Sequence, residues 1–128
     1  AFFRRQRQMC IRDRLKKDPI TKNTPIILFA RDPSCDLNNF LIPELDCLSL
    51  FTSADINEAM NTFNGKMAIQ GNLNPKILLE SDAILVDAVK QLSDSFQDYP
   101  GYIFNLGHGI TPDINPEKVA VMLDALRS

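Results

Sequence analysis

Short apolar runs alternate along this chain with longer segments in which apolar residues recur every three or four positions. The continuous runs span residues 26–30, 45–50, 67–70 and 102–106. Apolar runs of this length are typical of buried strands, and we expect the first to be buried on both faces. A helical pattern follows each run, so the order of elements is predicted to be β-α-β-α-β-α-β-α.

Each predicted strand is followed by a residue that is suited to begin a helix. Ser, Asp and Asn are preferred N-caps because their side chains accept hydrogen bonds from the first free backbone N–H groups. Glu58 stands three residues after one such candidate, which is the capping-box spacing, and Pro116 directly follows another. The predicted N-caps are Ser34, Asp55, Ser81 and Asn115, with a further helical turn over residues 75–80.

The last predicted helix carries its apolar residues at helical spacing. Val119, Met122, Leu123 and Leu126 are expected to face inward. All the connections between strands are long enough for right-handed parallel crossovers. The predicted fold class is therefore α/β, with four parallel strands alternating with helices. Four such units form half of a (β/α)8 TIM barrel, and a separate four-stranded parallel sheet is the alternative that the pattern leaves open.

A histidine between two glycines follows the last predicted strand. His108 is the only histidine in the chain, and Gly107 and Gly109 flank it. Ligands of α/β proteins usually bind where loops leave the carboxyl ends of the strands, and glycine lets the backbone approach a ligand closely. Arg31 and Asn72 follow other strands in the same way, so we expect them to share one rim with His108, and Gln70 lies at the end of a predicted strand where it could line the same pocket. Their structural alternatives are a turn histidine, loop amides that fix a turn, and an arginine in a surface ion pair.

Composition narrows the class of protein. The 128 residues, 45% of them hydrophobic, are enough for one globular domain. No apolar run approaches the ~20 residues of a membrane span, and no apolar stretch follows the first charges as in a secretory signal. Three cysteines without a CxxC pair argue against a zinc cluster. An odd number of cysteines suits a reducing compartment, so we expect a cytosolic protein. From the lack of a spanning run we expect no membrane partner.

Positive charge is concentrated at the amino terminus. Residues 1–17 contain seven Arg or Lys residues and one acidic residue, whereas the rest of the chain is acidic. A basic arm is able to contact nucleic acid, but no aromatic platform or binding motif accompanies this one, so no nucleic-acid partner is predicted. Residues 1–14 are predicted to be an extension outside the domain, of the kind that a sequencing artefact adds. Residues 15–128 are predicted to form the half-barrel.

Four motifs resemble the uroporphyrinogen decarboxylase family, and they occur in the family's order. They are PIILFARD at residues 25–32, LDCLSLFTSAD at 45–55, IQGNLNP at 69–75 and NLGHGITPDINPE at 105–117. The last two are specific because glycines, amides and prolines recur in them at fixed offsets. The second departs from the family motif GLDW, since Ser49 replaces its glycine and Phe51 and Thr52 replace its Asp-Trp. The resemblance covers about residues 24–127.

The resemblance implies the carboxyl-terminal half of the (β/α)8 barrel of a cytosolic carboxy-lyase without metal or organic cofactor. The family removes the carboxyl groups of the four acetate side chains of uroporphyrinogen III, giving coproporphyrinogen III in porphyrin and haem biosynthesis. This implies a tetrapyrrole substrate and a homodimeric full-length parent. The motif histidine corresponds to His108, which would bind a substrate carboxylate, with Gln70, Asn72 and Arg31 lining the pocket. The family's arginine clamp and pyrrole-binding aspartate belong to the amino-terminal half, so no catalytic residue is expected here.

Two other functions remain open at this point. Cobalamin-dependent methyltransferases share this barrel superfamily but bind zinc through Cys and His, and neither Cys35 nor Cys47 is placed next to His108 in the sequence. The second alternative is that this chain is a truncated fragment without activity of its own.

Overall fold

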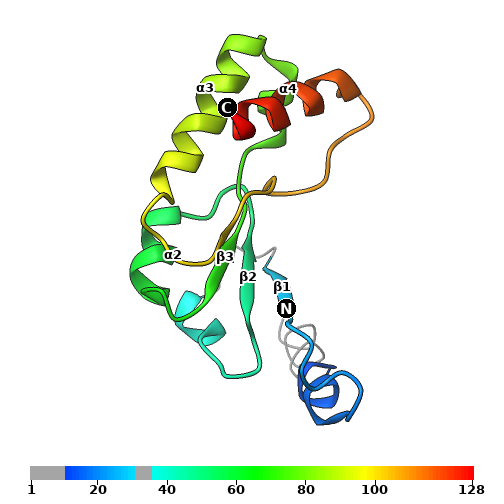
Figure 1. The fold of residues 1–128 in the computed structure, drawn as a ribbon, viewed down its shortest axis with the longest axis vertical. Helices are drawn as coiled ribbons and strands as arrows, with labels where there is room; N and C mark the ends of the chain where they lie inside the picture. The colour runs from blue at the N-terminus through cyan, green and yellow to red at the C-terminus, as the bar shows by residue number, and fades with distance from the viewer. Residues whose placement is uncertain (1–10, 31–35) are drawn as a thin grey trace.

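A four-stranded parallel sheet forms the centre of the computed structural model, which describes residues 11–30 and 36–128 (Figure 1). The strands are β1 (Ile27–Ala30), β2 (Cys47–Leu50), β3 (Ala68–Gln70) and β4 (Tyr102–Ile103). They lie in the order β1-β2-β3-β4, and every adjacent pair is parallel. Because the sheet keeps the sequence order, each connection is a crossover between neighbours, as in successive units of a βα barrel. The predicted α/β fold is confirmed.

The helices begin at the predicted caps wherever those caps are described. The helical segments are η1 (Leu37–Phe40), α2 (Ile56–Phe63), η2 (Pro75–Leu79), α3 (Asp82–Ser95) and α4 (Pro116–Arg127). Asp55, Ser81 and Asn115 accept hydrogen bonds from backbone N–H groups of the first turns of α2, α3 and α4. Ser34 lies outside the described residues, and η1 is capped by Asp36, which accepts from Asn38 N at 3.0 Å.

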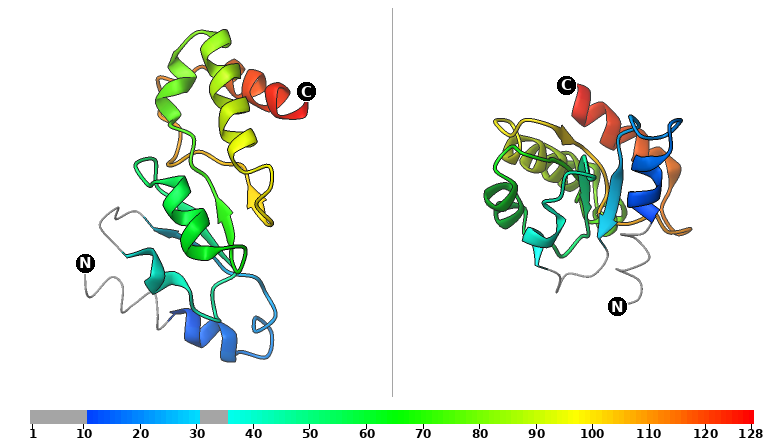
Figure 2. Two further views of the ribbon diagram at one scale, coloured as in Figure 1. Left: turned by 90° about the vertical axis from the view of Figure 1, so that its left-hand side faces the viewer. Right: turned by 90° about the horizontal axis from the view of Figure 1, so that it is seen from below.

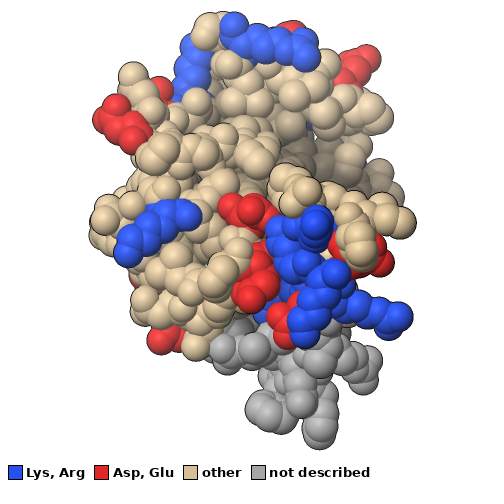
Figure 3. Space-filling model, turned by 60° about the horizontal axis from the view of Figure 1, so that its bottom comes forward, with Lys and Arg blue, Asp and Glu red and all other residues tan. Residues whose placement is uncertain are grey.

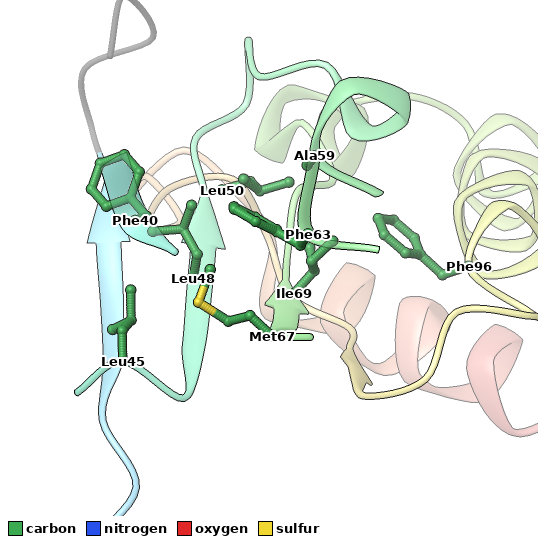
Figure 4. Close-up of a cluster of buried hydrophobic side chains, with 9 residues drawn as sticks. All are labelled: Phe40, Leu45, Leu48, Leu50, Ala59, Phe63, Met67, Ile69 and Phe96. Atoms are coloured by element: carbon green, nitrogen blue, oxygen red, sulfur yellow. The ribbon is translucent and has the colours of Figure 1, made fainter. Parts of the chain in front are cut away.

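One face of the sheet is covered by η1, α2 and the end of α3, and this contact contains the main hydrophobic core (Figure 4). Leu48 pairs with Leu28 and Ile69 in register, and Ile69 pairs with Tyr102. The ring of Tyr102 stacks on Phe96 with centroids 3.9 Å apart. The buried residues of this core are Phe40, Leu45, Leu48, Leu50, Ala59, Phe63, Met67, Ile69 and Phe96.

A second core lies beyond the carboxyl ends of β3 and β4, where α4 packs against α3 and η2 (Figure 2). Its buried residues are Leu73, Leu78, Leu85, Val89, Ile114, Met122 and Ala125. Lys118 ties the helices together, because its Nζ donates to Glu80 O at 2.9 Å and pairs with the Asp82 carboxylate. The prediction that Leu123 faces inward is wrong, since α4 turns Met122 and Ala125 to the core and leaves Leu123 39% exposed.

The other face of the sheet is open at its two edges. Ile27 is 50% exposed, Phe29 41% and Ile103 43%. The prediction that β1 is buried on both faces is wrong in this chain, because β1 is an edge strand and only its Leu28 face meets the core. By contrast, all four residues of β2 are buried, since this strand has a neighbour on each side.

Residues 11–17 are helical and lie at the amino end of the sheet. The Lys16 ammonium pairs with Asp46 Oδ2 at 3.3 Å, and the same oxygen accepts from Ile26 N at 2.7 Å. Lys and Arg side chains gather at this end with acidic side chains among them (Figure 3). The helix crosses residue 14, and the predicted domain boundary there stays a prediction. In the described part of the chain, none of the helices has the length and apolar character needed to cross a membrane.

Cys47, the first residue of β2, allows the burial of this strand to be tested. The side chain is 3% exposed, and burial, followed by the charge of Asp46, raises the pKa of its thiol to about 11. With Cys10 and Cys35 replaced by Ser, we expect iodoacetamide at about pH 8 to leave the folded chain unmodified but to alkylate it in concentrated urea, because the thiolate is the reactive form. Equal alkylation rates in the two conditions would contradict the buried position.

The same shift predicts a pH dependence of stability. The folded thiol stays protonated up to a higher pH than the unfolded thiol, whose ordinary pKa is 9.0. The free energy of unfolding should therefore fall as the pH rises from 9.0 toward about 11, and this loss should be absent in Cys47→Ala. Urea melts of both variants across this range measure the difference.

Candidate functional site

The parallel pairing of β3 and β4 continues beyond the ends of the two strands. Leu73 N donates to Asn105 O at 3.1 Å, and Gly107 N donates to Leu73 O at 2.8 Å. Leu73 and Leu106 form a parallel bridge between these hydrogen bonds. The backbone that leads to His108 is therefore held against the segment that contains Asn72.

Gly107 also lies directly against the loop that follows β2. A Cβ added at Gly107 would stand 2.5 Å from Thr52 Cα and 2.6 Å from Thr52 N, and would overlap Thr52 Oγ1 as well. Only glycine fits this approach without a shift of backbone. Thr52 Oγ1 is buried and has no hydrogen-bond partner within the described ranges.

Asn72 ties the same β2 loop to β3. Its side chain is 8% exposed, and its Nδ2 donates to Phe51 O and to Ala54 O, each at 3.0 Å. Both amide hydrogens are thus used to hold the backbone of this loop. The geometry gives Asn72 a structural task, and its contact with a ligand stays a prediction.

Gln70 lies in a row that crosses the open face of the sheet. Phe29, Ser49, Gln70 and Ile103 are paired in register along this row. Gln70 Nε2 donates to Ser49 Oγ at 3.0 Å. Gln70 is half-buried and is the last residue of β3, so it lies just inside the rim.

His108 is half-buried beside an aromatic residue of the β2 loop. Its ring centroid is 6.0 Å from that of Phe51, with an interplanar angle of 33°. Its Nδ1 is 2.9 Å from Gly109 O, so Nδ1 is placed to donate to this carbonyl. Nε2 then accepts a hydrogen bond in the neutral ring and donates one in the protonated ring. A protonated His108 is therefore able to bind a carboxylate.

The described structure brings three of the four predicted site residues to one end of the sheet. His108 and Asn72 both contact Phe51, whereas Gln70, at the end of β3, bonds to Ser49. Arg31 lies outside the described residues. The comparison with GLDW placed Phe51 and Thr52 on a wall of the site, but it predicted neither the contact of Phe51 with His108 nor that of Thr52 with Gly107. Alternation along β2 would have put Phe51 on the open face with Ser49, but the contacts with His108 and Gly107 are long-range and leave no local signal.

Within residues 11–30 and 36–128 there is no group of three or more His, Cys, Asp and Glu side chains that could hold a metal ion. Cys47 begins β2, whereas His108 follows the far end of β4, so the fold does not bring these two together.

The chain also matches a known protein family. The model of the uroporphyrinogen decarboxylase family matches residues 6–128. The chain belongs to the uroporphyrinogen decarboxylase family. The match begins within residues 1–14, whose assignment as a separate extension stays a prediction.

Three curated relatives, each named uroporphyrinogen decarboxylase, show the extent of the similarity. The Alcanivorax borkumensis protein is 37% identical over 114 residues, 89% of this chain and 32% of the relative. The Jannaschia protein is 39% identical over 105 residues, 81% of this chain and 30% of the relative. The Legionella pneumophila protein is 38% identical over 102 residues, 80% of this chain and 29% of the relative. The chain thus spans about a third of the length of these relatives.

The contact between Gly107 and Thr52 predicts a difference between two neighbouring glycines. Gly107→Ala should lower the free energy of unfolding by about 1–3 kcal/mol, because the methyl group meets backbone atoms of Thr52. Gly109→Ala is the matched control, since an added Cβ there meets nothing within 4 Å, and it should change stability by less than about 0.5 kcal/mol. Urea melts of both variants test this, and equal effects would contradict the packed loop.

Proposed function

We propose that this chain is the carboxyl-terminal part of a uroporphyrinogen decarboxylase, a carboxy-lyase that converts the four acetate side chains of uroporphyrinogen III to methyl groups. Membership in the family and the relatives of that name support this proposal. The observation that carries it is the hydrogen bond from Gly107 N to Leu73 O, because it holds His108 at the carboxyl rim of the sheet. Ligands of α/β barrels bind at that rim.

In this proposal His108 binds one of the substrate carboxylates. Loss of carbon dioxide from an acetate side chain leaves electrons that a protonated pyrrole ring accepts, so the enzyme must hold the ring in place while the carboxylate departs. A charge-assisted hydrogen bond from His108 Nε2 to a carboxylate other than the departing one, such as the acetate of another pyrrole, would hold the substrate in place without taking part in the bond breaking. Arg31, which follows β1, is proposed as a second cation for the carboxylates.

Gln70 and Asn72 complete this wall of the pocket in different ways. Gln70 lies on the same face of the sheet as Ser49, with its Nε2 bound to Ser49 Oγ, which leaves its carbonyl oxygen as the group proposed to meet the substrate. Asn72 keeps the β2 loop closed on β3 through Phe51 O and Ala54 O. The catalytic groups themselves are proposed to come from the remaining length of the parent enzyme. That parent is proposed to be a cytosolic homodimer that works without a metal or an organic cofactor.

A fusion enzyme tests the proposal. The part of the Alcanivorax borkumensis relative that precedes the matched region would be joined to this chain, and decarboxylation of uroporphyrinogen would be assayed without oxygen. We expect turnover by the fusion and none by the 128-residue chain alone. His108→Asn should lower kcat/KM about 10- to 100-fold, as expected when a charged hydrogen bond is lost, with little change in a thermal melt.

Lys90→Gln, on the exposed side of α3, is the control and should leave kcat/KM unchanged. Turnover by the isolated chain would show that the catalytic groups lie within it. Unchanged kinetics of His108→Asn in an active fusion would remove His108 from the substrate site.

A further inference from the structure

Three aromatic rings form a row along the carboxyl rim. Phe51 is in the middle, with the Phe29 centroid at 6.2 Å and the His108 centroid at 6.0 Å. The rings come from β1, from the loop after β2 and from the loop after β4. Phe29 is 41% exposed and the other two are half-buried, so this row forms part of the open surface of the sheet.

The backbone at Phe51, the middle residue of the row, is held by contacts with neighbouring segments. The backbone carbonyl of Phe51 accepts from Asn72 Nδ2 at 3.0 Å and from Ala54 N at 2.9 Å. The next residue, Thr52, is pressed against Gly107, which directly precedes His108. The backbones of Phe51 and His108 are therefore held near each other by contacts on both sides.

Phe51 stands where the GLDW motif of the family has an aspartate. A phenyl ring there replaces a carboxylate by a flat apolar surface next to the proposed carboxylate-binding histidine. Aromatic rings gain energy from offset stacking on other aromatic rings. A pyrrole ring that bears an acetate arm is the matching ligand, because it presents a flat aromatic face and a carboxylate together.

The distance between the rings suits such a ligand. An acetate arm places its carboxylate oxygens about 4 Å from the centre of the pyrrole ring, and a hydrogen bond to a ring nitrogen adds about 2.8 Å. A pyrrole stacked over Phe51 would thus reach the edge of an imidazole whose centre is 6.0 Å away.

We propose that Phe51 is a specificity-determining residue, whose ring stacks on a pyrrole of the substrate while His108 binds the acetate of the same ring. This inference rests on the proposed function and adds to it the residue that recognises the aromatic plane. Phe51 thereby favours an aromatic ring over a saturated ring of the same size with the same acid group.

The first test examines the geometry in the 128-residue chain. His108 is the only histidine, so its imidazole proton signals in an NMR spectrum need no further assignment. We expect a nuclear Overhauser effect between these protons and the Phe51 ring, lost together with the ring-current shift in Phe51→Leu and kept in Phe51→Tyr. Absence of this contact in the unsubstituted chain would overturn the proposal.

The second test measures binding of two acids, pyrrole-3-acetate and cyclopentylacetate, by the shifts of the His108 protons. We expect pyrrole-3-acetate to bind more tightly, and Phe51→Leu to weaken it about three- to tenfold while Phe51→Tyr does not. Phe51→Leu should leave cyclopentylacetate unaffected. The methyl signals of Leu48 and Ile69 report whether each variant is folded. If Phe51→Leu is not folded, the comparison of the two acids in the unsubstituted chain carries the test.

The outcomes separate this proposal from the function on which it rests. Equal binding of the two acids, or pyrrole binding that is unchanged by Phe51→Leu, would overturn the stacking role and leave His108 as a carboxylate ligand. No response of His108 to either acid would contradict both the carboxylate contact and the stacking role.

Discussion

The site depends on the continuation of the β3–β4 pairing past the strands themselves. β4 has two residues, yet the chain after it stays paired through Asn105 O, the Leu73–Leu106 bridge and Gly107 N. The contact of Gly107 with Thr52 then joins this loop to β2. Contacts of Gly107 with Thr52 and of Asn72 with Phe51 O and Ala54 O thus hold the loops that leave β2, β3 and β4 in one arrangement. His108, Phe51 and Asn72 owe their relative positions to these contacts.

The two faces of the sheet serve different purposes. One face is packed against η1 and α2 and supplies the main core, while the second core fixes α3 and α4 beyond the rim. The opposite face has exposed apolar side chains at both edge strands, Ile27 and Phe29 on β1 and Ile103 on β4. In a (β/α)8 barrel these positions point into layers that alternate strands fill together. The apolar side chains of the edge strands are exposed in this chain, which agrees with its covering only about a third of the length of its relatives.

The sequence predicted most of the fold because the relevant signals are local. Apolar runs and N-caps act within a few residues, so Asp55, Ser81 and Asn115 were found at their caps. Whether a residue lies at a strand end depends only on where that strand stops. The sequence therefore placed His108 and Asn72 on one rim. Burial of β1 was overestimated because it requires neighbours that this chain does not supply. The contact between Phe51 and His108 was missed because the two residues are 57 positions apart in the sequence and only the folded sheet brings them together.

Hydrogen exchange at the amide of Gly107 tests the central claim most directly. If Gly107 N–H is bonded to Leu73 O, its exchange should be slowed to a degree comparable with the amides of Gly71 and Leu73, which donate to the β4 side at 3.1 Å each. The amide of the exposed Gly109, two residues on, should exchange much faster. If Gly107 exchanged as fast as Gly109 while Gly71 stayed protected, the loop would be detached from β3, and His108 would have no fixed place on the rim.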